Sequence, residues 1–212
     1  MYLENIPPNP KALIILAHGA GAPMDSPFME AFAQQLAAVG ISVVRFEFPY
    51  MQERRTQGRK RPPDRQPVLL DCWREVVSRY AQGLPLFIGG KSMGGRMATV
   101  LASEDLPIKG VVALGYPFHP PGKPDRLRTE HLARMGCPAL VVQGERDPFG
   151  RREEVEHYQL PSSLQVHWIP QGDHDLQPPK RSGLSAEGNL GLAVTAVKEF
   201  IETCLEQDMS PG

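Results

Sequence analysis

A glycine-rich stretch, FIGGKSMGGR at residues 87–96, carries residue types that fit two different chemistries. Gly90, Lys91 and Ser92 resemble the end of a phosphate-binding P-loop, in which backbone N–H groups surround phosphate oxygens. Gly90, Ser92 and Gly94 instead fit the GxSxG pattern, in which a serine on a sharp strand-to-helix turn attacks a carbonyl carbon. The first pattern predicts nucleotide binding, and the second predicts acyl transfer.

The P-loop interpretation fails at one position. Its loop needs a glycine five residues before the Gly-Lys pair, but that position is Pro85, which lacks an N–H group and has a fixed φ. The residues between, Leu86 to Ile88, are apolar enough to belong to a buried strand. The GxSxG pattern needs no adjustment, because a helix-compatible segment, RMATVLASE, follows it directly. We therefore interpret Ser92 as a nucleophile.

An acid and a histidine follow Ser92 in the chain order expected of a Ser-Asp-His triad. Asp147 comes just after the apolar run CPALVVQG, and His174 comes after LQVHWIP. Each has a plainer interpretation, because Asp-Pro also initiates turns and acidic residues on either side of His174 solvate its loop. Glu145 is a rival acid that lies closer to the strand end. The joint pattern predicts the triad Ser92, Asp147 and His174.

Two backbone N–H groups are expected to stabilise the negative oxygen that forms during acyl transfer. One belongs to Met93, the residue after the nucleophile. The other is expected from the HGAG turn after the first strand, with Ala20 as the best donor, because glycines on either side let the backbone approach a substrate. We interpret His18 in this turn as structural.

Three further residues are predicted to contact substrate. Arg54 and Arg55 lie in the basic segment 51–67, which could bind an anionic group or could simply be a solvated charged loop. His119, in the proline-rich segment 116–124, either faces the site or packs within its loop. Lys91 is next to the nucleophile, but the tight turn directs it away, so we do not expect a Ser-Lys pair.

Six short apolar runs supply the strands that must position these residues. Most are continuously apolar, as expected when helices cover both faces of a parallel sheet. The candidate strands are residues 12–17, 41–48, 84–90, 109–116, 137–144 and 164–170.

Helical segments are expected between these strands, so strand and helix alternate along the whole chain. This alternation predicts one α/β domain over residues 1–212, with a doubly wound, mostly parallel sheet. The two basic or proline-rich segments, 51–67 and 116–124, are expected to be irregular. The candidate helices are residues 27–39, 67–81, 92–104, 124–135, 150–158 and 187–207.

The composition is that of an ordinary globular protein, with 41% hydrophobic and 22% charged residues and a net charge of -1. This charge argues against binding to nucleic acid or to an anionic membrane. The three cysteines form no CxxC pair, so neither a disulfide framework nor a cysteine metal site is expected. The first apolar run is too short for a signal core or a membrane span. We expect a cytoplasmic protein, if bacterial.

With these motifs in place, the chain resembles the α/β-hydrolase superfamily over nearly its full length. The segments LAHGAGAPMDSPFM, FPYM, GGKSMGGRMA, GYPFHPPGKPDRLRTEHL and GERDPFG are similar to a compact dienelactone-hydrolase-like branch. That branch also includes the hydrolase-like domain of a subunit of the NSL chromatin-acetylation complex. Ser92 stands where dienelactone hydrolase has a cysteine nucleophile, which puts that enzyme's activity in doubt.

The resemblance implies a six-stranded sheet of order 2-1-3-4-5-6. We expect the usual antiparallel strands before the first parallel one to be missing, because only about eleven residues precede the run at position 12. We also expect no lid domain, because residues 116–137 suffice only for a loop and one helix.

The expected function is a carboxylesterase- or thioesterase-like serine hydrolase that acts on a small-molecule ester or thioester and needs no metal or organic cofactor. The alternative is a non-catalytic interaction domain that keeps the fold. The sequence makes no prediction about an oligomeric partner.

Overall fold

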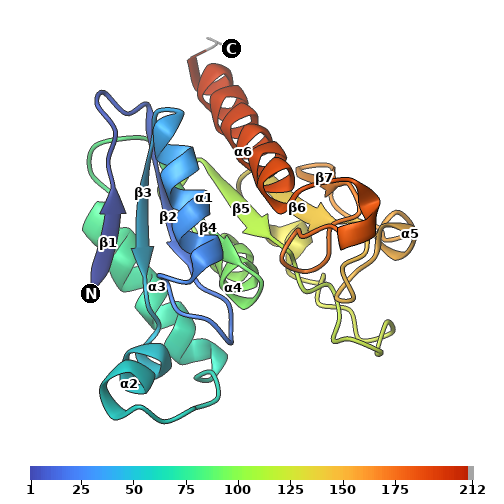
Figure 1. Cartoon of the computed structure of the whole chain (residues 1–212). Helices are drawn as coiled ribbons and strands as arrows, with labels where there is room; N and C mark the ends of the chain where they lie inside the picture. Colours follow the sequence, from blue (N-terminus) through green and yellow to red (C-terminus); the bar gives the residue numbers. More distant parts are fainter. Residues whose placement is uncertain (210–212) are drawn as a thin grey trace.

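A computed structural model of the chain describes residues 1–209, and within them one sheet of seven strands forms the centre of the molecule (Figure 1). The last three residues of the predicted domain 1–212 lie outside the described residues. The strand order across the sheet is β1-β3-β2-β4-β5-β6-β7. The strands are β1 (Tyr2–Asn5), β2 (Ala12–Ala17), β3 (Ile41–Phe46), β4 (Leu86–Lys91), β5 (Gly110–Leu114), β6 (Ala139–Gly144) and β7 (Leu164–Ile169).

Strands β2 to β7 are the six predicted strands, and their order confirms the predicted 2-1-3-4-5-6 arrangement of a mostly parallel sheet. The expectation that no antiparallel strand precedes them is wrong. Residues Tyr2–Asn5 form β1, which pairs antiparallel with the outer edge of β3, with Tyr2 opposite Phe46. Four residues are enough because this edge strand needs to contact one neighbour only. The sheet therefore has seven strands rather than six.

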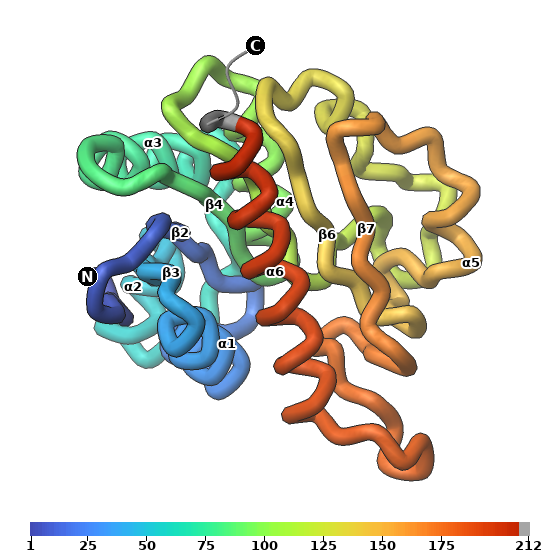
Figure 2. The backbone as a smooth tube through the Cα atoms, turned by 90° about the horizontal axis from the view of Figure 1, so that it is seen from above, coloured from blue at the N-terminus to red at the C-terminus, as the bar shows by residue number. Residues whose placement is uncertain are grey.

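Helices cover both faces of the sheet, as the apolar strands predict (Figure 2). Helices α1 and α6 lie on one face, and α3 and α4 lie on the other. The helices are α1 (Pro27–Ala38), α2 (Pro49–Gln57), α3 (Gln66–Tyr80), α4 (Met93–Leu101), α5 (Arg152–Val155) and α6 (Ala186–Met209). Two short 3-10 helices, Leu132–Arg134 and Lys180–Ser182, complete the regular structure.

Three predicted segments differ from the structure. The helix expected at 124–135 is absent from this stretch apart from the turn Leu132–Arg134, because tertiary bonds hold the loop: the Arg128 N–H donates to the Phe118 carbonyl at 2.8 Å, and the Tyr116 hydroxyl donates to the Arg128 carbonyl at 2.7 Å. The helix expected at 150–158 is confined to Arg152–Val155. The segment 51–67 is not wholly irregular, since α2 occupies it up to Gln57.

The core is divided into two layers by the sheet, because alternate residues of each central strand face opposite helices. On β2, Leu13 and Ile15 pack with Trp73 of α3, while Ile14 and Leu16 belong to the layer that contains Phe32 of α1. Both layers are closed to solvent. The rigid sheet fixes the loops at its carboxyl edge, where β4, β6 and β7 end.

The segment between β5 and β6, residues 115–138, contains no helix or strand besides the 3-10 helix Leu132–Arg134, so the described part of the chain contains no lid domain, as expected. None of the helices in residues 1–209 combines the length and apolar character needed to span a membrane.

Candidate active site

Ser92 occupies a sharp turn between the end of β4 and the start of α4. Its backbone has φ 50 and ψ -116, a conformation that a non-glycine residue adopts only when its surroundings enforce it. The enforcement comes from close backbone packing: a Cβ atom on Gly94 would lie 2.5 Å from the His18 carbonyl oxygen. Ser92 is therefore held at the first turn of a helix, where partial positive charge favours a developing anion.

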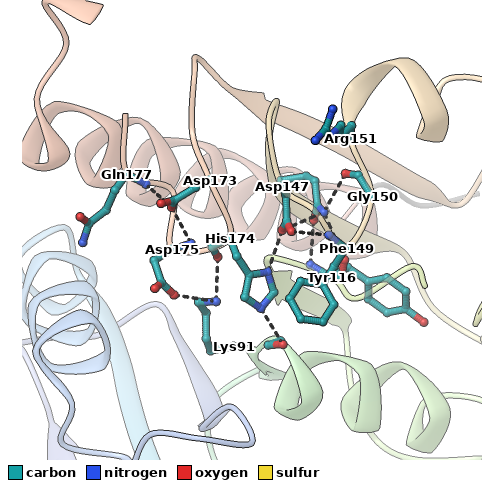
Figure 3. A network of polar contacts seen from close by, with 12 residues as sticks. Lys91, Tyr116, Asp147, Phe149, Gly150, Arg151, Asp173, His174, Asp175 and Gln177 are labelled. Atoms are coloured by element: carbon teal, nitrogen blue, oxygen red, sulfur yellow. Dashed lines mark hydrogen bonds and ion pairs between the residues drawn. The ribbon is translucent and has the colours of Figure 1, made fainter. Parts of the chain in front are cut away.

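The structure brings the three predicted triad residues into one hydrogen-bonded row (Figure 3). Ser92 Oγ lies 2.9 Å from His174 Nε2, and His174 Nδ1 lies 2.8 Å from Asp147 Oδ2. Because an ionised carboxylate only accepts, Nδ1 carries the proton in this row, and Nε2 has its lone pair toward the Ser92 hydroxyl. The imidazole is thus oriented to take the proton of Ser92.

Asp147 is fully buried, and two neighbouring groups donate hydrogen bonds to its carboxylate besides His174. The Phe149 N–H donates to Oδ1 at 2.9 Å, and Gln143 Nε2 donates to Oδ2 at 3.1 Å. Gln143 also accepts from the Tyr116 N–H at 2.7 Å, so it ties the ends of β5 and β6 to the acid. Sequence reasoning missed Gln143, although a polar residue in the apolar run ALVVQG was a usable signal.

The neighbouring carboxylates have other partners. Glu145 accepts from Arg152 at 3.0 Å and from the Gln171 N–H at 2.9 Å, so it stabilises the loop before His174 from outside. Asp173 accepts from the N–H groups of Asp175 and Gln177, which closes the turn that carries the histidine. Of these acids, only Asp147 bonds to the His174 imidazole.

Lys91 joins the nucleophile turn to the histidine loop. Its Nζ donates to the His174 carbonyl at 2.8 Å and lies 3.1 Å from Asp175 Oδ1 (Figure 3). The centroid of the Phe28 ring lies 5.6 Å from the same Nζ. Burial lowers the pKa of the Lys91 ammonium below its ordinary value, and the Asp175 carboxylate opposes this effect. As expected, the ammonium contacts these groups rather than the Ser92 hydroxyl. The hydrogen bond from Lys91 to the His174 carbonyl was not predicted.

The Phe149 ring packs against the His174 imidazole, with the two ring centroids 4.2 Å apart. The interplanar angle is 30°. The imidazole is therefore confined by Phe149 as well as by its two hydrogen bonds.

The turn that contains Ala20 lies beside Ser92, and both residues line the same cleft. His18 Nδ1 is 2.7 Å from the Gly19 carbonyl, and its Nε2 accepts the Phe48 N–H at 3.2 Å. Burial lowers the pKa of His18, so the neutral ring acts as a structural brace. The Tyr50 hydroxyl, another group that sequence reasoning missed, donates to the Ala20 carbonyl at 3.0 Å.

Met93 is the first residue of α4, where backbone N–H groups have no partner within the helix. Ala20 lines the cleft over Ser92, and Met93 directly follows the nucleophile. The role of their N–H groups as oxyanion donors stays a prediction from the sequence.

The structure does not bring the three predicted substrate contacts to this cleft. Arg55 bonds to Glu47 at 2.7 Å and pairs with Asp25, and both carboxylates raise the pKa of its guanidinium. Arg54 lies on α2, outside the residues that line the cleft. His119 is 2% exposed, with its ring nitrogens near the Pro120 carbonyl and Glu154. Substrate contact by these residues stays a prediction from the sequence.

The cleft over Ser92 is open and has a volume of about 510 Å³. Its walls are formed mainly by small and apolar residues from the loop after β2, the start of α1 and the His174 loop. They include Ala20, Ala22, Pro27, Phe28, Met29 and Phe149.

Comparisons with known proteins agree with the fold described above. Residues 10–202 match a family model described as an alpha/beta hydrolase domain. Est1E from Butyrivibrio proteoclasticus superposes with a TM-score of 0.70 at 17% identity, over 97% of this chain and 94% of that protein. A dienelactone hydrolase from Anabaena variabilis gives a TM-score of 0.72 at 22% identity, over 93% and 88% of the two chains.

An α/β serine hydrolase without a lid from Xanthomonas campestris gives a TM-score of 0.65 at 16% identity, over 100% of this chain and 90% of the other. At such identities the likeness concerns the fold. The narrower resemblance to a chromatin-complex subunit is not among these findings.

Proposed function

The chain belongs to the family of alpha/beta hydrolase domains, and on this basis we propose that it is a serine hydrolase that cleaves an ester or thioester through an acyl-enzyme. The observation that carries the proposal is the row Ser92–His174–Asp147, with its two contacts of 2.9 and 2.8 Å. A fully buried carboxylate is costly to keep even when it accepts hydrogen bonds, and its contact with the His174 imidazole gives it a chemical use.

In the first half of the reaction, His174 Nε2 takes the proton from Ser92 as Oγ forms a bond to the substrate's carbonyl carbon. The carbonyl oxygen becomes an oxyanion, which we expect the N–H groups of Met93 and Ala20 to stabilise. Asp147 stabilises the imidazolium that results. The tetrahedral intermediate then collapses, the bond to the leaving alcohol or thiol breaks, and His174 returns its proton to that group.

In the second half, water attacks the acyl-serine. His174 accepts a proton from the water, a second tetrahedral intermediate forms, and its collapse returns the proton to Ser92 Oγ and releases the carboxylic acid. The open cleft gives water access to the acyl carbon. Every proton transfer runs through His174, so all chemical steps depend on the orientation that Asp147 imposes.

The proposal is tested by labelling with a fluorophosphonate, followed by intact-mass measurement and by assay of p-nitrophenyl acetate and an acetyl thioester. We expect one label per chain and ester hydrolysis, both lost in Ser92→Ala. Ser103→Ala is the matched control, because Ser103 is an exposed serine just beyond α4 whose hydroxyl donates to the Val100 carbonyl. A folded protein that is not labelled, or that is labelled equally after Ser92→Ala, would support the non-catalytic alternative.

A further inference from the structure

The cleft over Ser92 adjoins a second hollow. Four residues line both spaces, namely Pro27 and Phe28 at the start of α1, and Asp175 and Gln177 in the loop after His174. The second hollow has a volume of about 380 Å³ and lies between α1 and the beginning of α6, two helices on the same face of the sheet (Figure 2). The two spaces therefore adjoin one another, and together they form a groove over the start of α1 and the loop after His174.

The walls of the second hollow are mainly apolar. Phe28, Ala31 and Gln35 follow one another at helical spacing along one face of α1, so two of three positions on this side are apolar. Leu190 and Ala186 face them at i and i+4 on α6. The Phe28 ring lies parallel to Phe32, with centroids 6.3 Å apart, so it forms a fixed wall at the junction of the two spaces.

Charge along the groove disfavours an anionic occupant. Asp175 and Glu187 are the acidic residues in its walls, and both are exposed. Within residues 1–209, Lys91 is the only lysine or arginine that lines either hollow, and its ammonium already contacts Asp175 and the His174 carbonyl. A neutral, apolar group therefore fits the groove better than a carboxylate or phosphate.

We propose that the hollow between α1 and α6 binds the apolar chain of an ester whose carbonyl carbon lies at Ser92, so that the substrates are neutral esters with a medium-length hydrocarbon chain. This inference rests on the proposed hydrolase function. Short substrates such as acetates reach only the first cleft, whereas a longer chain passes Phe28 and buries methylene groups against Ala31 and Leu190.

The expected selectivity follows from the hydrophobic effect. A fully buried methylene contributes about fourfold to binding, so four added methylenes in a half-open groove should raise kcat/KM by about tenfold. The hydrocarbon chain of the substrate can belong to the acyl group or to the alcohol of the ester, and two substrate series separate these cases. One series varies the acyl group from acetate to octanoate with p-nitrophenol as leaving group. The other varies the alcohol from ethyl acetate to n-octyl acetate.

The test compares the wild type with Ala31→Phe, which narrows the far hollow without touching the cleft at Ser92. Ala38→Phe is the matched control, since it adds the same ring at an exposed position in the last turn of α1. We expect Ala31→Phe to lower kcat/KM about tenfold for the long ester of at least one series and to leave the acetyl esters with short alcohols unchanged. Ala38→Phe should change neither.

Equal kcat/KM for short and long esters in both series would overturn the inference. So would an equal loss of kcat/KM for short and long esters in Ala31→Phe. In either case, hydrolysis that depends on Ser92 would still support the proposed hydrolase function. Titration of the Ser92→Ala variant with n-octyl acetate, followed by NMR, measures the same binding without turnover. Binding that weakens in the Ser92→Ala/Ala31→Phe double variant supports the inference, and absence of binding overturns it, whatever the outcome of the labelling experiment.

Discussion

Replacing Lys91 with methionine should separate the activity of this protein from its stability. The ammonium of Lys91 is buried beside the nucleophile, where its Nζ donates to the His174 carbonyl at 2.8 Å and pairs with the exposed Asp175. Methionine has a similar length and removes the charge and both contacts. It leaves the Ser92, His174 and Asp147 side chains in place but frees the loop that carries the imidazole.

The magnitude for activity follows from the lost bond. A hydrogen bond from a charged donor contributes about 1.5–3 kcal/mol, so if this energy positions the imidazole for reaction, kcat/KM should fall by about 10- to 100-fold. Asp175→Asn keeps the bond from Lys91 to the His174 carbonyl and should lose less than about threefold, as expected for an exposed ion pair.

The stability should change in the opposite sense. Burial lowers the pKa of Lys91 below 10.5, so the unfolded chain binds this proton more tightly than the folded chain does. The charge therefore costs folding free energy at neutral pH, and this cost disappears as the pH rises toward 10.5. At pH 7, Lys91→Met should unfold at an equal or higher temperature than the wild type. In alkaline buffer, the unfolding temperature of the wild type should rise relative to that of the variant.

Steady-state hydrolysis of p-nitrophenyl acetate and thermal unfolding by circular dichroism, each at several pH values, provide the two measurements. Wild-type activity in Lys91→Met would refute the positioning role. A fall in activity that matches a fall in unfolding temperature would mean that Lys91 supports the fold as a whole.

Three other changes test the site and its scaffold. Asp147→Asn should lower kcat/KM by about 10³- to 10⁴-fold with the fold retained, because an amide favours the wrong imidazole tautomer; an effect below tenfold would contradict the triad. Gly94→Ala places a Cβ atom 2.5 Å from the His18 carbonyl and should cost about 1–3 kcal/mol in urea unfolding, whereas Gly21→Ala, with open space around its Cβ, should cost little. Burial lowers the pKa of His131 to about 4, so stability should fall as the pH drops from 6.5 toward 4, and His131→Gln should flatten this dependence in urea titrations.

The residues of the row at Ser92 could be predicted because each follows the end of a strand, and parallel strands deliver such positions to one edge of the sheet. The contacts that support them could not. Lys91 reaches the His174 carbonyl across 83 positions of sequence, and the Tyr50 hydroxyl reaches the Ala20 carbonyl across 30. Such pairings depend on how loops pack against each other, which residue type and local spacing do not specify.

The same reasoning explains the errors in the fold. Helix α2 has Pro49 at its first position and Gly58 as its C-cap, and both are sequence signals for helix ends. The many charged residues in this segment led instead to the prediction of an irregular loop. The segment 124–135 has helical spacing, yet bonds from Tyr116 and to Phe118 fix the backbone of Arg128 in another conformation. Tertiary contacts there override a local preference that is worth little in isolation.

The short strand β1 protects the sheet from self-association. It covers the outer edge of β3 from Val43 to Phe46, and β3 is buried along its whole length. Without it, the unpaired N–H and C=O groups of an apolar strand would be open to pairing with another copy of the chain. The edge that β1 itself offers is only four residues long, and Pro7 and Pro8 follow it closely. These first residues, remote from Ser92, thus act against edge-to-edge aggregation.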